Sequence, residues 1–389
     1  MQKVQTTKKM AQAQQKKRFI IKIIILVAEL FAIVGLLIWF LNIKLNKIDR
    51  QELVSEKSEL INKDLKEETA HVLEGYMDFA IFGVDNRSNG DTDSGNSDVI
   101  MICSIDNATK KIKLVSVYRD TFCDTDVGYD TGINFHKINQ AYAVGGYKQA
   151  IKVLNANLDL DIEHFVTVDF NAVTDLVNLV GGVDIELTDV EVKRINHNIK
   201  TTGKITGKKA SLIQSAGVNH LDGTQATAYC RIRYTAGNDY RRTQRQRKVL
   251  TEVFKKVKTA DLETINKIVD TIFPEISTDM SNMEILMLAA DINNFEIDGT
   301  AGYPFNKYAT DFGGSKGDVV CAADWKTNVR ALHEFLYDNK EYTPSDTVET
   351  YNRLLTENYG ITIDKGDEAT KFINEGVQID DFNGVANAN

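Results

Sequence analysis

The chain has 389 residues, of which 43% are hydrophobic and 26% are charged, so it can bury a large core, and disordered and collagen-like classes are excluded. The net charge is -9, although residues 1–22 contain seven basic residues and no acidic one. The rest of the chain is therefore more acidic than the total. This excludes a general nucleic-acid binder, because such proteins need a positive surface to displace counterions from phosphates.

The N-terminal region has the pattern of a membrane anchor. Residues 23–41 read IIILVAELFAIVGLLIWFL, with one ionisable residue, Glu29, and as a helix this run would span about one bilayer core. It is too long for the apolar region of a cleaved signal peptide. We predict a transmembrane helix over residues 19–42 with a basic cytoplasmic tail over residues 1–18, which makes the chain a single-pass protein of the cell membrane with its main domain outside.

Two segments flank that domain. Residues 43–75 are highly charged, and Leu53, Leu60 and Leu65 are roughly on helical spacing. This pattern indicates a juxtamembrane helix that holds the domain off the bilayer. Residues 341–389 are poor in apolar residues and are expected to form an accessory segment and a loose tail.

Residues 76–340 alternate apolar, strand-like runs with helical patterns. The alternation predicts an α/β fold, a layered α-β-α domain. Turn-like residues 107–110 between two strand runs predict a hairpin, so the central sheet is expected to be mixed. The expected strands cover residues 79–84, 99–105, 112–117, 165–170, 183–187 and 226–234, and the expected helices cover 141–154 and 173–180 and follow Asp239, Ser281 and Trp325.

The four cysteines show neither CxxC spacing nor clusters with histidine, which argues against a zinc site. Cys103 and Cys230 lie in apolar, strand-like runs and are expected to be buried thiols. Cys123 and Cys321 are then the only loop-like pair for a disulfide in an exported domain.

Two acidic residues lie at the ends of expected strands. Asp85 follows the strand 79–84, and Asp98 begins the next one. Ligand sites of α/β sheets lie at strand ends, and paired carboxylates suit a hard cation such as Mg²⁺, with water and phosphate oxygens completing its shell. Solvated loop carboxylates are the alternative, since such residues are common.

Arginines also fall near strand ends. Arg119 follows the strand 112–117, and the period of two places Arg231 and Arg233 on one face of the expected strand 226–234. Residues on one strand face can act on one ligand. These positions therefore make the three arginines candidates for an anion site.

The helix after Asp239 carries an unusual charge pattern. At about 100° per residue, Arg242 and Gln246 share the arc of its apolar residues. Arg245 lies at the edge of that arc, and Arg247 points to the opposite side. Buried arginines need anionic partners. The pattern favours an internal phosphate or pyrophosphate clamp, with a structural ion-pair network as the alternative.

Seven stretches between about residues 79 and 257 form a series. They read FGVDNR, SDVIM, VSVYRDT, KINQAYAVGG, VDFNAVTDLVNLVGGVDI, LDGTQATAYCRIRY and DYRRTQRQRKVL. In this order, and with an N-terminal membrane anchor, the sequence resembles the LytR-CpsA-Psr family of cell-envelope proteins. It differs from the family pattern at Tyr118, where proline is usual, and at Val99, where threonine is usual.

The resemblance implies an enzyme that transfers a glycopolymer, such as wall teichoic acid or a capsular polysaccharide, from an undecaprenyl-pyrophosphate carrier to peptidoglycan as a phosphodiester. The implied cofactor is Mg²⁺. The implied partners are the lipid-linked glycan, the peptidoglycan acceptor and the membrane, with no nucleic acid.

The resemblance also implies roles for single residues. Asp85 and Asp98 would hold the metal. Arg119, Asp120 and Asp239 would be catalytic, with the two aspartates orienting arginines or one of them acting as base toward the acceptor hydroxyl. The pyrophosphate would be bound by a set of basic and amide side chains, namely Arg87, Arg119, Lys137, Arg231, Arg233, Arg242 and Gln246.

Other functions would use parts of the same set. A Mg²⁺-dependent polyprenyl-pyrophosphate pyrophosphatase would have the same clamp with water as acceptor. A non-enzymatic, membrane-anchored receptor for anionic glycopolymers would need the arginines but not both Asp85 and Asp98. A transcription regulator would need access to DNA, which the predicted topology denies.

Overall fold

A computed structural model describes residues 39, 42–53, 57–84, 97–129, 132–233 and 238–366. The chain forms two compact units, residues 1–47 and 48–389, and the second contains the whole α/β domain. The predicted transmembrane segment lies outside the described residues apart from Trp39 and Asn42, as do Asp85 and Arg87. Within the described ranges, no helix combines the length and apolar character that a membrane crossing requires.

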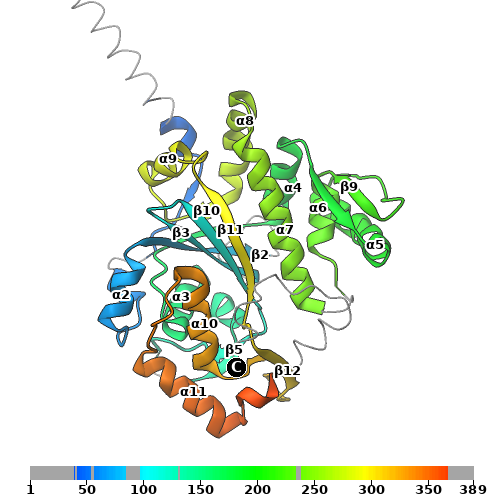
Figure 1. Cartoon of the computed structure of the whole chain (residues 1–389). Helices are drawn as coiled ribbons and strands as arrows, with labels where there is room; N and C mark the ends of the chain where they lie inside the picture. Colours follow the sequence, from blue (N-terminus) through cyan, green and yellow to red (C-terminus); the bar gives the residue numbers. More distant parts are fainter. Residues whose placement is uncertain are drawn as a thin grey trace, which may run out of the picture. The chain divides into compact units, whose positions relative to one another are not determined.

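The domain is built on a mixed sheet, which has seven strands within the described residues (Figure 1). In order across the sheet, they are β1 (Asp49–Arg50), β10 (Ile276–Thr278), β7 (His164–Val168), β2 (Tyr76–Val84), β3 (Ser97–Asp106), β4 (Lys111–Val117) and β11 (Glu296–Tyr303). Strands β2, β3 and β4 are antiparallel neighbours, whereas β7 runs parallel to β2 and β11 parallel to β4. The predicted mixed sheet is therefore confirmed.

Helices cover both faces of this sheet. Because successive strand residues point to opposite sides, Phe82 and Ile102 face one layer while Met101 and Leu114 face the other. The first layer contains α3 (Asn139–Leu158), α10 (Trp325–Tyr337) and α11 (Asp346–Tyr359), and the second contains α7 (Asn238–Lys258) and α9 (Asn282–Ala290). Figure 1 shows α11 on one side of the sheet and α9 on the other.

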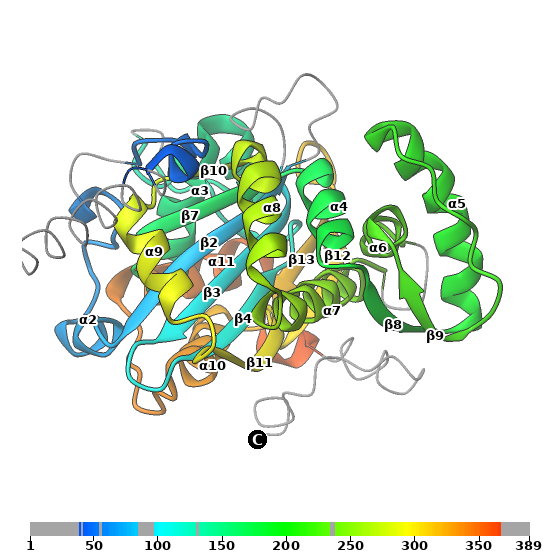
Figure 2. The same cartoon turned by 90° about the horizontal axis from the view of Figure 1, so that it is seen from above.

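A second, smaller core lies beside the sheet. It joins α4 (Phe170–Leu179), α5 (Asp189–Thr206), α6 (Gly223–Cys230) and one side of α7 with the hairpin of β8 (Val183–Leu187) and β9 (Gly217–Leu221). Figure 2 shows α4 and α6 between the sheet and α5. The remaining described elements are α2 (Glu67–Leu73), α8 (Leu262–Ile272), the short turns η1 (Lys57–Glu59), η2 (Phe273–Glu275) and η3 (Ile363–Lys365), and the pairs β5 (Phe122–Asp124) with β6 (Phe135–Lys137) and β12 (Lys307–Asp311) with β13 (Asp318–Ala322).

Most expected elements exist, with shifted ends. The predicted hairpin is the antiparallel pair β3 and β4, and Lys110 in its turn has a left-handed backbone. The expected strand 165–170 ends early, because the Asp169 carboxylate accepts hydrogen bonds from the backbone of Asn171 and Ala172, at 2.8 and 2.9 Å, and so begins α4.

The expected strand 226–234 is wrong, since residues 223–230 form the helix α6. The side chain of Asp222 accepts from the backbone of Gln225 at 2.8 Å, and the Gln225 side chain accepts from the backbone of Asp222 at 2.9 Å. This reciprocal cap starts a helix and outweighs the strand preference of the residues that follow. Arg231 and Arg233 therefore follow a helix and do not share a strand face.

Both flanking segments contribute to the main core. Residues 43–75 are not one helix: they contain β1, η1 and α2, and Leu53 and Leu60 are buried. In residues 341–389, predicted to be an accessory segment and a tail, α11 buries Val348, Tyr351 and Leu355 against the same core. A low apolar content is enough here because these three residues lie on one side of the helix.

All four cysteines lie in described ranges and are free. Cys103 is buried in β3 as expected, whereas Cys230 at the end of α6 is half-buried. Cys123 and Cys321 are in the strands β5 and β13, buried in the core, so the loop-like disulfide pair is not formed.

Candidate active site

A cavity of about 1340 Å³ lies between one face of the sheet and the helices α4 to α7. Its apolar lining comes from both sides and consists of Ile81, Val84, Val99, Met101, Val168, Phe170, Val173, Leu176, Val177, Val190, Ile205, Val249, Leu250 and Val253. Six of the predicted site residues also line it, namely Asp98, Arg119, Arg231, Arg233, Arg242 and Gln246. The structure thus brings residues from distant parts of the sequence to one cavity.

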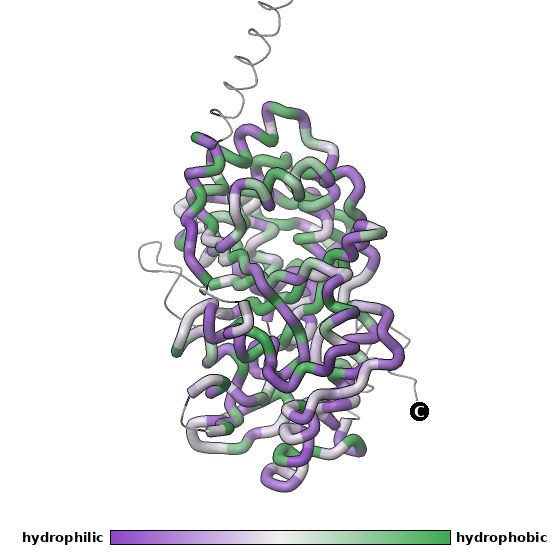
Figure 3. Tube along the Cα trace, turned by 90° about the vertical axis from the view of Figure 1, so that its left-hand side faces the viewer, coloured by the Kyte–Doolittle hydropathy of each residue, from purple (hydrophilic) through white to green (hydrophobic). Residues whose placement is uncertain are grey.

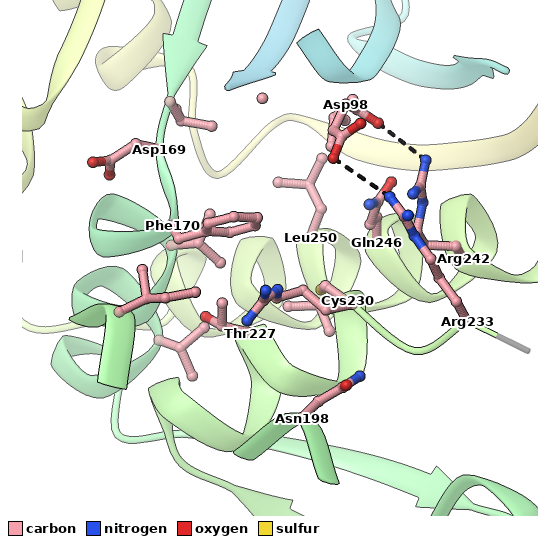
Figure 4. Close-up of a pocket in the computed structure, with 18 of the residues that line it drawn as sticks. Asp98, Asp169, Phe170, Asn198, Thr227, Cys230, Arg233, Arg242, Gln246 and Leu250 are labelled. Carbon is pink, nitrogen blue, oxygen red and sulfur yellow. Dashed lines mark hydrogen bonds and ion pairs between the residues drawn. The ribbon is translucent and has the colours of Figure 1, made fainter. Parts of the chain in front are cut away.

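Asp98, near the start of β3, lies at the centre of an arginine cluster (Figure 4). Its Oδ1 accepts from Nη1 of Arg119 at 2.5 Å, and its Oδ2 lies 3.5 Å from Nη2 of Arg233. Arg242 donates to the backbone carbonyl of Asp98 at 3.4 Å. Burial raises the pKa of Asp98, but the three guanidinium groups lower it by more, so the net pKa is below the usual value. Asp98 is therefore ionised at neutral pH.

Arg119 follows β4, and its guanidinium group also contacts the neighbouring carboxylate of Asp120. The Nε atom of Arg119 lies 3.4 Å from Oδ2 of Asp120, whose Oδ1 lies 3.5 Å from Nζ of Lys137. Asp120 and Lys137 do not line the cavity. Their contacts agree with the expectation that Asp120 orients an arginine, while its action as a base stays a prediction.

Arg231 lines the same cavity but has different partners. Its Nη1 donates to Oγ1 of Thr202 at 2.9 Å, and its guanidinium carbon lies 5.1 Å from the centre of the Phe170 ring. These contacts join the end of α6 to α5 and α4. Arg231 is thus directed toward the helical wall of the cavity, and Arg233 toward Asp98.

The inward orientation of α7 is confirmed for two residues. Arg242 is 2% exposed, and it lines the cavity together with Gln246, Val249 and Leu250. The Oε1 atom of Gln246 is buried and has no hydrogen-bond partner among the described residues. This oxygen is therefore not used in a hydrogen bond to the described residues.

Two other arginines of α7 are also buried, one of them against expectation. Arg247, expected to face solvent, is 1% exposed, because α7 is packed between the sheet on one side and α6 and β8 on the other. Arg245 is also buried, and its Nε donates to Oε1 of Glu191 at 2.8 Å. The helix therefore carries both a structural ion pair and a cavity-lining arginine.

The described residues do not by themselves form a metal site. They contain no group of three or more His, Cys, Asp or Glu side chains placed to hold an ion. Asp98 directs both carboxylate oxygens toward arginines, and its predicted partner, Asp85, is outside the described ranges. Asp239 lies in the first turn of α7, and its side chain is likewise not described.

One wall of the cavity carries basic side chains that were not among the predicted site residues. Lys193, Arg194, His197 and Lys204 of α5 all line it. They recur along one helix, so their spacing was a usable signal. The wall adds positive charge opposite the sheet.

Residues 40–308 match the model of the LytR_cpsA_psr family. The chain belongs to this family. Two curated relatives are polyisoprenyl-teichoic acid–peptidoglycan teichoic acid transferases. TagU of Enterococcus faecalis is 28% identical over 281 residues, covering 71% of this chain and 83% of TagU. TagV of Bacillus subtilis is 27% identical over 303 residues, covering 76% of this chain and 71% of TagV.

Solved structures show the same fold as this LytR_cpsA_psr protein. A structure of TagT bound to LI-WTA has a TM-score of 0.55 at 22% identity, covering 73% of this chain and 99% of the other. The protein gbs0355 from Streptococcus agalactiae has a TM-score of 0.58 at 23% identity, covering 75% of this chain and 97% of the other. At these identities the likeness concerns the fold alone.

Proposed function

We propose that this LytR_cpsA_psr protein transfers a glycopolymer, wall teichoic acid or a capsular or similar polysaccharide, from an undecaprenyl-pyrophosphate carrier to peptidoglycan. The observation that carries the proposal is a single cavity that combines apolar walls with the arginine cluster around Asp98. Its relatives TagU and TagV, which are named as teichoic acid transferases, support the same reaction.

The cavity fits an amphiphilic, anionic lipid. Its volume, about 1340 Å³, is larger than the ~300–1,000 Å³ of most small-molecule pockets, which leaves space for part of a polyprenyl chain. Phe170, Val173 and Leu176 supply an apolar surface for that chain. Arg119 and Arg242 supply the positive charge that a buried pyrophosphate needs.

The proposed reaction is a phosphoryl transfer. The acceptor hydroxyl oxygen, on a muramic acid residue of peptidoglycan, forms a bond to the phosphorus next to the sugar, and the bond from that phosphorus to the bridging oxygen breaks. Undecaprenyl phosphate leaves, the product is a phosphodiester, and Asp120 or Asp239 accepts the hydroxyl proton. Negative charge grows on the phosphate oxygens as this happens, so the preorganised guanidinium groups of Arg119 and Arg242 stabilise the transition state.

Mg²⁺ is the proposed cofactor. Asp98, ionised at neutral pH, and Asp85 would hold it together with pyrophosphate oxygens. When bound, the ion would supply further neutralisation of the reacting phosphates. The described carboxylates do not complete such a site without Asp85 and the substrate, so binding is expected to depend on both.

The proposed location follows from the substrate. Undecaprenyl carriers lie in the bilayer and peptidoglycan lies outside it. A single N-terminal span with residues 1–18 in the cytoplasm would place the catalytic domain where both meet.

The test is an assay of the Asp98→Asn variant, with a synthetic polyprenyl-pyrophosphate glycan as donor and a peptidoglycan oligomer as acceptor in the presence of Mg²⁺. The variant should bind the lipid, because the arginines remain, while transfer falls by about a hundredfold or more. Asp184→Asn, at an exposed residue that contacts His220, is the matched control and should transfer normally.

Three other results would contradict the proposed transfer or the role of Asp98 in it. Unchanged transfer by Asp98→Asn would remove the role of this carboxylate. Glycan phosphate released equally well without acceptor would identify a pyrophosphatase. Lipid binding by the unmodified protein without turnover, whatever the Mg²⁺ concentration, would identify a receptor.

A further inference from the structure

Exposed apolar side chains occur on both α8 and α9. Leu262 is 88% exposed, Met283 is 65% exposed and Met287 is 53% exposed. In Figure 3 the trace at the upper end of the domain, where Figure 1 places α8 and α9, alternates hydrophobic and hydrophilic stretches. We call these three residues the α8/α9 patch.

The helix α9 is apolar on two sides. Its inner side packs Leu288 on the sheet, next to Ile292, and its outer side carries Met283 and Met287, four residues apart. A helix that is apolar all round is normally buried, and no residue of α9 is. Flexible methionine side chains also suit an irregular apolar partner. The outer side therefore has the character of a surface that contacts something apolar.

A short stretch of chain links the predicted membrane span to β1. That span ends at Asn42, and the stretch from there to Asp49 covers at most about 25 Å even when fully extended. Asp49 and Arg50 form β1, which pairs with β10, and β10 leads directly into α9. The guanidinium group of Arg50 also donates to the side chain of Asn282, the first residue of α9.

Helix α8 is linked to the cavity through α4. Helix α8 packs on α4, and Phe170, Val173 and Leu176 of α4 line the cavity. On α8 the charges of Glu263 and Lys267 are paired at 2.7 Å. The positive charge of Lys267 is thus balanced within α8, and Asp261 and Glu284, next to Leu262 and Met283 in the sequence, are acidic.

We propose that the α8/α9 patch docks on the outer surface of the bilayer, with phospholipid as its occupant. This rests on the membrane anchoring that forms part of the proposed function. Docking holds the helix α4 side of the cavity against the membrane, so that a lipid carrier enters the cavity without crossing water. Because the contact is apolar, it depends weakly on ionic strength.

The experiment measures tryptophan quenching by brominated phospholipids in the full chain, reconstituted in phosphatidylethanolamine and phosphatidylglycerol vesicles. The chain has two tryptophans. Trp39→Phe removes the one near the end of the predicted span, and Trp325, 1% exposed in α10, stays as an internal reference. In this background, Met287→Trp reports on the patch. Val144→Trp, at a 62% exposed position of α3 on the other side of the sheet, is the control.

Bilayer docking predicts strong quenching for Met287→Trp, little quenching for Val144→Trp and a small change between low and high salt. Equal quenching of the two variants, or none, would overturn it. A second copy of this chain on the patch would shift the emission of Met287→Trp with protein density and without quenching by bromolipid, which would also overturn it. The unmodified chain reports on anchoring separately, because quenching of Trp39 together with an unquenched Met287→Trp variant would refute docking while leaving the anchor intact.

A functional measurement completes the test. The double variant Met283→Glu with Met287→Glu should transfer glycan normally from a short-chain, detergent-soluble donor and lose most transfer from a full-length donor in vesicles. Val144→Glu should resemble the unmodified protein with both donors. Loss with both donors would point to a damaged fold, and loss with neither would refute docking.

Discussion

The arginines around Asp98 keep its carboxylate ionised, and the carboxylate in turn fixes the position of the arginines. The carboxylate is held ionised by three guanidinium groups, which lowers its pKa although burial opposes this. The same charge holds Arg119 and Arg233 in place before any substrate is bound. Preorganised donors of this kind need no rearrangement when charge develops on a phosphate. At the scale of residues, the site is therefore a cluster of guanidinium groups held in place by one internal carboxylate.

Replacement of Arg242 by alanine should lower transfer by about a hundredfold or more, because it removes a preorganised positive charge from the reacting phosphates. The measurement is the transfer rate at saturating donor, with thermal unfolding as a check on the fold. Arg353→Ala, at a 57% exposed residue of α11, is the control. Equal losses of rate and of stability in Arg242→Ala would reduce this residue to a structural role.

Contacts with the sheet on one side and with the second core on the other fix the position of helix α7. Arg245 pairs with Glu191 of α5, and Arg242 reaches Asp98 of β3. Near its start, Tyr240 packs on Tyr118 with ring centres 4.6 Å apart, and Lys307 lies within about 5 Å of both rings. The helix is thus tied at once to the sheet and to the second core, which form opposite walls of the cavity.

Arg245→Ala should reduce the free energy of unfolding by about 3–5 kcal/mol, because it leaves the carboxylate of Glu191 buried without its partner. Urea denaturation measures the change. The double variant Arg245→Met with Glu191→Leu should lose clearly less than Arg245→Ala, since no buried charge is left. A double variant as unstable as the single one would show that charge is not the cause.

Asp78 of β2 accepts a hydrogen bond from Tyr337 of α10, and burial raises its pKa from 3.8 to about 6. The folded state holds this proton more tightly than the unfolded state, so the contribution to stability is present below about pH 4 and is lost as the pH rises to 6. Above that, the ionised carboxylate costs on the order of 3 kcal/mol. The Asp78→Asn variant cannot ionise at this position. Its free energy of unfolding should therefore rise relative to that of the unmodified protein as the pH increases from 4 to 8. The exposed Asp338→Asn should not show this pH dependence.

At the scale of the whole molecule, two cores share one helix and enclose one cavity. The sheet and its helices form the larger core, the hairpin of β8 and β9 with α4 to α6 forms the smaller, and α7 belongs to both. The family match ends at residue 308, yet α10 and α11 complete the larger core. Truncation after the matched region would therefore expose apolar surface.

Protease treatment of intact protoplasts should digest the domain that begins at Ile48 and leave residues 1–18 protected, because the basic N-terminal flank is expected in the cytoplasm. Immunodetection of tags at the two ends measures this. Lysed protoplasts, in which both ends become accessible, are the control. A protected C-terminal domain in intact cells would contradict the proposed topology and with it the proposed access to peptidoglycan.

The sequence by itself determined the features that depend on local periodicity. Apolar runs indicated β2, β3 and β4, and the apolar arc of α7 correctly directed Arg242 and Gln246 inward. The order of motifs was enough to indicate the family. These signals are visible because each is contained within one element or in a short run of residues.

Only the tertiary structure decided what depends on a second layer. A helical arc describes one buried side, so it could not reveal that α7 is covered on both sides and that Arg247 is buried. Strand preference placed Arg231 beside Arg233, whereas the reciprocal cap between Asp222 and Gln225 made a helix and separated them. The cavity itself exists because the sheet and the second core leave space between them, and such a space is a property of packing between elements that no single element encodes.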